Sequence, residues 1–254
     1  MNANDTLIIE NLSHAFDGND GESISVLDKI SLKVPHGKIV SIIGPSGCGK
    51  STLLDCISGL ITPNEGTICY KGNSFVGKHE ISYMTQSAAM LPWRKIIDNL
   101  TLPMEIQKVP LSSARKEAMS LLEEFNLEKW ADYYPHTLSG GMLQRVSLLR
   151  AYLSKKEIMV LDEPFSKLDA LTKLQIQEWF LRVWQKHKKT VIFVTHDIEE
   201  ALIISDSIYV FSKRPAHILK IIKIPFVRPR TIALSANKDY LKLKTQLLQM
   251  FVGD

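Results

Sequence analysis

The chain of 254 residues is 45% hydrophobic and 23% charged, which is typical of a soluble globular protein. No apolar run approaches the roughly 18 residues of a membrane-spanning helix, and the first residues lack the basic start and apolar core of a signal peptide, so we expect a cytosolic protein. The formal net charge of +4 is small, and because nucleic-acid binders more often carry a broad basic face, we expect no nucleic-acid partner.

Short apolar stretches predict strands along much of the chain. The first lie at residues 7–9, 12–16 and 25–34, with turn-rich segments between the second and third. Three later runs, at residues 39–43, 158–161 and 191–194, are apolar on both faces. Such strands are typical of the middle of a parallel sheet that helices cover, which indicates an α/β fold.

A mostly helical stretch is predicted from about residue 87 to 154. Its clearest sign is an apolar stripe at helical spacing, formed by Ala114, Ala118, Leu121, Leu122 and Phe125. We interpret residues 87–154 as a helical subdomain inserted into a single domain that spans residues 1–254.

The strongest motif directly follows the strand at residues 39–43. It fits the pattern G-x-x-x-x-G-K-[ST] and precedes an apolar helix start. The glycines let successive N–H groups face a phosphate, and the helix N-terminus adds a favourable partial charge. We expect Lys50 to reach the β- and γ-phosphates of a nucleotide and Ser51 to bind Mg²⁺. The motif consists of Gly44, Pro45, Ser46, Gly47, Cys48, Gly49, Lys50, Ser51 and Thr52.

Cys48 lies inside this loop at a helix N-terminus, so we expect its thiolate to be favoured and its reactivity to exceed that of Cys56 and Cys69. The alternative is a packed, inert thiol. The three cysteines lack C-x-x-C spacing, which argues against a zinc site and indicates a reducing compartment.

A pair of acids, Asp162 and Glu163, ends the strand at residues 158–161. Ligands of parallel sheets lie at the carboxyl ends of the strands, so we expect both acids to face the phosphate loop. Asp162 would hold Mg²⁺, and Glu163 would act as the general base that polarises the attacking water. A solvated acidic turn is the alternative, because Asp-Glu pairs after strands are common.

A third motif, Leu138-Ser139-Gly140-Gly141-Met142, precedes a predicted helix. Ser139 can cap this helix, and the two glycines expose backbone N–H groups that suit a phosphate. A plain capped helix explains the same residues equally well.

Together, in this order and spacing, the three motifs resemble the Walker A, signature and Walker B motifs of ABC ATPases, from about residue 7 to 230. The resemblance implies a P-loop NTPase fold of ABC type, with an N-terminal antiparallel β part and a parallel-sheet core. It also implies Mg²⁺-dependent ATP hydrolysis in a head-to-tail dimer, with each ATP between the Walker A motif of one chain and the signature of the other.

The resemblance further implies roles for single residues. Phe16 matches the aromatic position that stacks on adenine, and Gln86 matches the Q-loop glutamine, which contacts Mg²⁺ and the attacking water. His196 matches the switch histidine at the γ-phosphate, and residues 166–169 match the D-loop at the dimer seam. The opposing chain would contribute Ser139, Gly140 and Gly141.

Further details resemble importers of the nitrate, sulfonate, taurine and pyrimidine-precursor group, notably residues 90–94, 134–136 and 228–230. This implies permease subunits as partners, an extracytoplasmic solute-binding protein as an indirect partner, and a peripheral location on the cytoplasmic face of a bacterial membrane. An exporter ATPase and a soluble ABC-type ATPase acting on DNA or the ribosome are alternatives. An inactive homologue is disfavoured because Lys50 and Glu163 are present. Lys167 departs from the small residue usual in the D-loop.

The basic charge is concentrated in a C-terminal extension, residues 213–254, which holds nine Lys or Arg against two Asp. These cations can be solvated, can attract anionic lipid, or can be structural in part. They are Lys213, Arg214, Lys220, Lys223, Arg228, Arg230, Lys238, Lys242 and Lys244.

Overall fold

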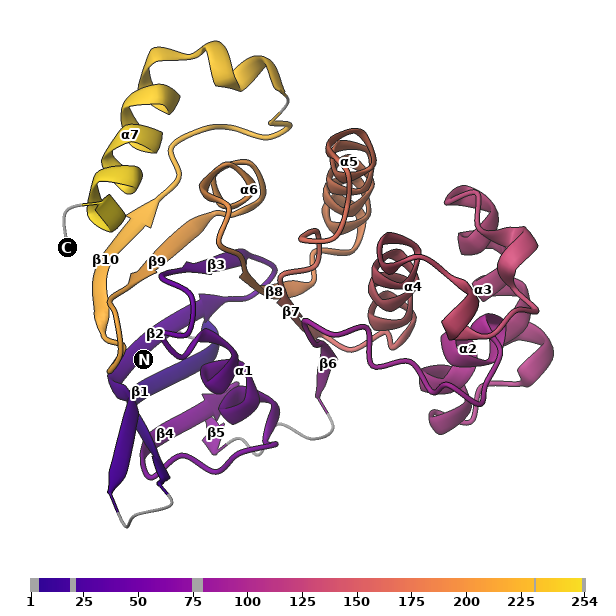
Figure 1. Cartoon of the computed structure of the whole chain (residues 1–254), viewed down its shortest axis with the longest axis horizontal. Helices are drawn as coiled ribbons and strands as arrows, with labels where there is room; N and C mark the ends of the chain where they lie inside the picture. The colour runs from indigo at the N-terminus through magenta and orange to yellow at the C-terminus, as the bar shows by residue number, and fades with distance from the viewer. Residues whose placement is uncertain (1–4, 19–21, 75–79, 231, 253–254) are drawn as a thin grey trace. The chain divides into compact units, whose positions relative to one another are not determined.

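The chain divides into two units. In the computed structural model, which describes residues 5–18, 22–74, 80–230 and 232–252, the first unit comprises Met1–His79 and Trp179–Asp254, and the second comprises Glu80–Glu178 (Figure 1).

The first unit contains an antiparallel sheet with the strand order β2-β1-β4-β5, which agrees with the expected N-terminal β part. A single strand, β1, replaces the two strands predicted at residues 7–9 and 12–16. The register shifts between Ile9 and Leu12, where Asn11 has a φ of 49°, so the polar residues there form an irregularity and do not end the strand. The strands are β1 (Asp5–Asp17), β2 (Ser23–Pro35), β4 (Glu65–Tyr70) and β5 (Asn73–Ser74).

Parallel strands form the centre of the first unit. β3 (Ile39–Ile43) pairs in parallel with β8 (Thr190–Val194) and with β9 (Ser207–Phe211), and β10 (Ile218–Lys223) adds to β9 in the antiparallel direction. Every residue of β3 and β8 is buried, which confirms the prediction of central strands at residues 39–43 and 191–194.

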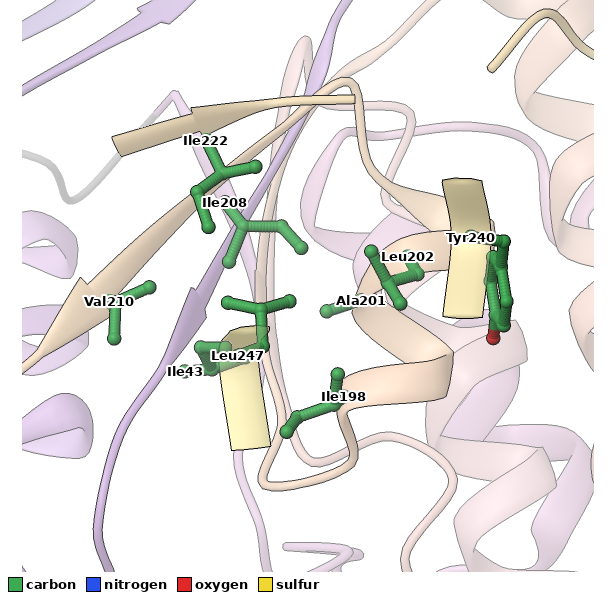
Figure 2. Close-up of a cluster of buried hydrophobic side chains, with 9 residues drawn as sticks. All are labelled: Ile43, Ile198, Ala201, Leu202, Ile208, Val210, Ile222, Tyr240 and Leu247. Atoms are coloured by element: carbon green, nitrogen blue, oxygen red, sulfur yellow. The ribbon is translucent and has the colours of Figure 1, made fainter. Parts of the chain in front are cut away.

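Helices pack against these strands. α1 (Lys50–Ser58) follows β3, α6 (Ile198–Ile204) follows β8, and η3 (Ile232–Ala236) leads into α7 (Lys238–Val252). Leu202 of α6 and Tyr240 and Leu247 of α7 meet apolar residues of β3, β9 and β10 in one cluster (Figure 2). Burial of each large side chain of this kind contributes about 1.5–3 kcal/mol. The C-terminal extension therefore forms part of the core of the first unit.

Two arginines of this extension are structural. Arg230 is buried; its Nη1 donates to the carbonyls of Leu202, Ile203 and Ser205, and its Nε donates to the carbonyl of Phe226. Arg230 therefore satisfies carbonyl groups at the C-terminal end of α6, which the helix itself cannot do. Burial lowers the pKa of Arg230 to about 10, which keeps the guanidinium charged at neutral pH.

Arg228 has a similar structural role near the end of α6. Its Nη2 donates to the carbonyl of Ile204 and lies 3.4 Å from Oδ2 of Asp206, while its guanidinium stacks 4.4 Å from the ring centre of Trp184. Two of the nine C-terminal cations are thus engaged inside the fold.

The second unit combines two parallel strands with helices. β6 (Ile81–Met84) pairs in parallel with β7 (Ile158–Asp162), and every residue of β7 is buried. Residues 96–153 hold the helices α2 (Ile96–Ile106), α3 (Leu111–Glu124) and α4 (Gly140–Leu153) and the 3₁₀ turns η1 (Glu128–Trp130) and η2 (Pro135–Thr137). α5 (Ala170–His187) runs from this unit into the first.

The predicted stripe is the buried face of α3, with Ala114, Ala118, Leu122 and Phe125 buried. Leu121 is half-buried, since it lies at the margin of that face. Among the described residues, no helix is both long enough and apolar enough to cross a membrane.

Candidate active site

The phosphate loop occupies residues 44–49, between the end of β3 and the start of α1. Gly49 has a φ of +121°, which strains any L side chain, and a Cβ there would lie 2.8 Å from Cγ1 of Val26. A Cβ on Gly44 would lie 2.9 Å from Cβ of Phe211. The loop therefore needs glycine at both positions, which is the physical basis of the sequence pattern.

Lys50 folds back over this loop. Its Nζ donates to the carbonyl oxygens of Gly44 and Pro45, each over 2.8 Å. Within the described helix α1, no side chain caps the N-terminus and the first turn holds no acidic residue. A helix N-terminus with its N–H groups, beside a fixed ammonium group, has the chemistry that binds a polyphosphate. The residues of the loop thus fit the phosphates of ATP.

The structure contradicts our expectation that the thiolate form of Cys48 is favoured. The residue is only 1% exposed, and its Sγ would lie 3.1 Å from a Cβ on Gly44, so the thiol packs inside the loop. Burial raises the pKa of Cys48 above its ordinary value, although the nearby Lys50 acts in the opposite direction. The desolvation of the thiolate outweighs the positive field of the loop.

Strand register places His196 level with the phosphate loop. In the parallel pair β3–β8, Ile42 lies opposite Val194, so Gly44 and His196 each come two residues later. The turn is held by Asp197, whose Oδ1 accepts the N–H groups of Glu199 and Glu200 and thereby caps α6. The His196 side chain is exposed at this turn.

Phe16, near the end of β1, is 42% exposed, and the ring of His14 meets it edge-on with the centroids 4.7 Å apart. One face of an aromatic ring that is partly open to solvent can stack on a nucleobase. The predicted site residues that lie in the first unit are Phe16, the phosphate loop with Lys50, Ser51 and Thr52, and His196.

In the second unit, the structure brings Gln86 and Glu163 together. Met84 of β6 lies opposite Leu161 of β7, so Gln86 and Glu163 each follow this pair by two residues. Nε2 of Gln86 donates to Oε2 of Glu163 over 3.2 Å. Asp162, the last residue of β7, is buried directly before Glu163.

Glu163 has an unusual backbone conformation, with a φ of 48°. A left-handed conformation of a non-glycine residue costs on the order of 1–3 kcal/mol, and the surrounding structure must hold it. The carbonyl of Glu163 accepts a hydrogen bond from Nε2 of Gln144 over 2.7 Å. Gln144 is a residue for which the sequence predicts no role in the site. The available signal was an amide four residues before Leu148, which places it on the buried side of α4.

The signature residues lie at the start of α4. Ser139 caps the helix, because its Oγ accepts the N–H of Met142 over 3.3 Å. Ser139 and Gly140 are exposed, and a Cβ on Gly141 would lie 3.2 Å from the carbonyl oxygen of Lys167. The D-loop backbone thus passes close to the signature, and a side chain at position 141 would press against it. The predicted site residues that lie in the second unit are Gln86, Ser139, Gly140, Gly141, Asp162 and Glu163.

The residues predicted to bind Mg²⁺ are Ser51 in the first unit and Gln86 and Asp162 in the second. Ser51, Gln86 and Asp162 each offer oxygen, the ligand that Mg²⁺ prefers. Within residues 5–18, 22–74, 80–230 and 232–252, no group of three His, Cys, Asp or Glu side chains could hold a metal by itself.

Comparison with known proteins shows which family the chain is similar to. A family model described as "ABC transporter" matches residues 27–166. The chain is 40% identical over 245 residues to an uncharacterized ABC transporter ATP-binding protein of Methanocaldococcus jannaschii, which covers 96% of this chain and 90% of that protein. It is 39% identical over 219 residues to the formylaminopyrimidine import ATP-binding protein ThiZ of Halalkalibacterium halodurans, with 86% and 84% covered.

The fold has a close solved counterpart in the dimeric structure of MJ0796, described as a bacterial ABC transporter cassette. The TM-score is 0.80 at 27% identity, and the match covers 87% of this chain and all of that one. The same cassette has been solved in a post-hydrolysis state with ADP and Pi, with a TM-score of 0.79. The chain therefore belongs to the ABC transporter family and has the α/β fold of its ATP-hydrolysing cassettes.

Proposed function

We propose that this chain is the ATP-binding and ATP-hydrolysing subunit that energises solute import through a partner membrane permease. The observation that carries the proposal is the phosphate loop, in which the ammonium group of Lys50 lies 2.8 Å from two loop carbonyls at the open N-terminus of α1. Relatives named as import ATP-binding proteins for formylaminopyrimidine, taurine and aliphatic sulfonates support import over export.

The phosphate loop and Lys50 bind and neutralise the triphosphate, and Phe16 stacks on the adenine. Ser51, Gln86 and Asp162 would hold Mg²⁺, which when bound neutralises charge on the phosphate oxygens. Phosphoryl transfer requires positioning and charge neutralisation more than covalent chemistry. The proposal requires the loop of the first unit and the acids of the second to engage one nucleotide.

Glu163 is the general base. Its carboxylate accepts a proton from water as the water oxygen forms a bond to the γ-phosphorus and the bond from phosphorus to the bridging oxygen breaks, giving ADP and phosphate. The hydrogen bond from Gln86 orients the carboxylate. His196 donates to an oxygen of the γ-phosphate and stabilises its charge.

A second copy of the chain completes each site in a head-to-tail dimer. Ser139, Gly140 and Gly141 of one copy contact the γ-phosphate held by the other, which suits the exposed start of α4, whose first turn carries no acidic side chain among its described residues. Hydrolysis then requires dimer closure, and closure converts ATP binding into movement.

The permease binds at the cytoplasmic face of the membrane, where the chain is a peripheral subunit. We assign this contact to the helical subdomain, residues 87–154, in which Trp93 exposes 71% of its surface beside the Q-loop. The solute-binding protein acts indirectly, through the permease. Residues 213–254 form the basic C-terminal extension of a single ABC ATPase domain.

The experiment that tests this function is ATPase stimulation in liposomes that contain the chain, its permease and the solute-binding protein. Turnover that rises with a transported solute, and only when the binding protein is present on the outside, is the expected result. Turnover that is indifferent to the permease and the binding protein contradicts the import function. Movement of solute from inside to outside would identify the exporter instead.

A further inference from the structure

The amide of Gln144 spans the loop that follows β7. Gln144 projects from the buried side of α4 and is only 3% exposed. Its Nε2 donates to the carbonyl of Glu163 over 2.7 Å and to Oγ of Ser166 over 3.2 Å. Its Oε1 accepts the N–H of Lys167 over 2.7 Å. One side chain thus holds the loop at both ends, from residue 163 to residue 167.

These partners determine which way the amide points. A backbone N–H can only donate, so the oxygen of Gln144 must face Lys167, and its NH₂ group then faces the carbonyl of Glu163. The Gln144–Glu163 hydrogen bond is partly buried, and its loss would leave the carbonyl of Glu163 with donors from Ser166 alone.

The carbonyl of Glu163 accepts several hydrogen bonds from the surrounding residues. Besides the bond from Gln144, it accepts hydrogen bonds from Oγ of Ser166 over 3.1 Å and from the N–H of Ser166 over 3.3 Å. These bonds hold the left-handed backbone of Glu163, with its φ of 48°. Because the backbone sets the direction of the side chain, a relaxed backbone would swing the carboxylate away from Gln86, 3.2 Å from it in this structure.

We propose that Gln144 is a positioning residue for ATP hydrolysis, which holds the carbonyl of Glu163 and thereby aims its carboxylate. This inference rests on the proposed role of Glu163 as general base. Gln144 itself touches neither nucleotide nor water in the reaction, so its loss affects the chemical step and leaves the binding of ATP intact.

The first test is Gln144→Met, which keeps the length of the side chain and removes both its donor and its acceptor. The matched control is Gln107→Met, because Nε2 of Gln107 donates to the carbonyl of Ser154 over 2.6 Å at the other end of α4. We expect Gln144→Met to lower kcat about tenfold or more, with the Kd for ATP changed less than about twofold. Gln107→Met should leave kcat near that of the unmodified chain. Equal kcat in the two variants overturns the proposal.

A second variant, Gln144→Glu, tests the donor itself and replaces the first variant if that protein does not fold. An ionised glutamate cannot donate to the carbonyl of Glu163, whereas a protonated one can. The kcat of Gln144→Glu relative to the unmodified chain should therefore rise as pH falls. A ratio that stays flat with pH contradicts the assigned hydrogen bond, because a packing role does not depend on that proton.

A double variant separates this inference from the function on which it rests. If Gln144 acts through Glu163, adding Gln144→Met to Glu163→Gln should not lower single-turnover hydrolysis further, and a further tenfold loss overturns the positioning role. An inactive Glu163→Gln together with an unimpaired Gln144→Met overturns the positioning role alone. Near-normal hydrolysis by Glu163→Gln overturns the role of Glu163 as well.

Discussion

Gln86 and Glu163 lie 77 residues apart in the chain, yet Nε2 of Gln86 donates to Oε2 of Glu163 over 3.2 Å. The parallel register of β6 and β7 explains this contact, because both residues follow the opposed pair Met84 and Leu161 by two positions. The carboxylate is therefore oriented by an amide in the segment that follows the neighbouring strand β6. Removing the charge of the carboxylate should change the chemistry and preserve the structure.

Glu163→Gln should keep the affinity for ATP and lower turnover by at least about 100-fold, because the phosphate loop stays intact and the general base is lost. The closed dimer should then accumulate with ATP bound. Nucleotide affinity, phosphate release and sedimentation measure these effects. Glu128→Gln, an exposed substitution in the same unit, is the control. If the Glu163 variant hydrolyses ATP like the control, Glu163 is not the base.

Phe16→Ala should weaken ATP binding about tenfold, since base stacking on an aromatic side chain contributes about 1–3 kcal/mol. The affinity for tripolyphosphate, which has no base to stack, should not change. Phe16→Tyr retains the ring and should bind ATP normally. Calorimetric titration of both ligands measures the difference. An equal loss of affinity for both ligands would show that the substitution distorts the loop and that Phe16 does not bind adenine.

Arg230→Met should lower the free energy of unfolding by about 2–4 kcal/mol, because it leaves the buried carbonyl groups at the end of α6 without their donor. Urea unfolding measures this change. Lys242→Met removes a cation from the same basic extension at an exposed position of α7 and should change stability by less than about 0.5 kcal/mol. Similar losses in the two variants would contradict the structural role of Arg230.

Cys48 should react slowly with iodoacetamide at pH 8, because burial raises its pKa and hides its sulfur. Burial also raises the pKa of Cys56 to about 11, so the half-buried Cys69 should be labelled first. Peptide mapping after timed labelling gives the order, and all three should react alike in urea. If Cys48 were labelled fastest, the original expectation of an activated thiolate at Cys48 would be correct.

The raised pKa of Cys48 also has a consequence for stability. The folded chain binds the thiol proton more tightly than the unfolded chain, whose cysteines titrate near 9.0. This contribution to folding is therefore complete below about pH 9 and is lost as the pH rises through the folded pKa. Compared with the unmodified chain, Cys48→Ala should lose less stability between pH 8 and pH 10 in urea unfolding. If Cys48→Ala lost as much stability as the unmodified chain over this pH range, the raised pKa of Cys48 would be contradicted.

The isolated chain should bind anionic vesicles weakly at low salt and dissociate at physiological salt. With Arg228 and Arg230 engaged inside the fold and Lys244 half-buried and paired with Glu199, six of the nine cations remain exposed in the extension. Each can contribute up to about 1 kcal/mol near a lipid surface. Flotation with phosphatidylserine vesicles across a salt series measures the binding, and neutral vesicles are the control. Binding that resists salt would show an apolar attachment in place of this electrostatic one.

Local pattern was sufficient for much of this molecule. The phosphate loop was predictable because single positions in it require glycine. At Gly49, for example, the positive φ and the close contact with Val26 exclude a side chain. The central strands at residues 39–43 and 191–194 were predictable because burial on both faces requires a continuous apolar run. The continuity of β1 through Asn11 was not predictable, because bulges and turns contain the same kinds of polar residue.

Only the tertiary structure decided which distant groups meet. The sequence by itself determined that Glu163 follows a strand. Its left-handed backbone and the hydrogen bond from Gln144 depend on how α4 packs against the loop that follows β7. Likewise, the sequence does not distinguish Arg230 from the eight other basic residues of the extension. Only the folded structure shows that it donates to carbonyl groups at the end of α6. The pKa of Cys48 follows from burial, and burial is a property of the folded chain as a whole.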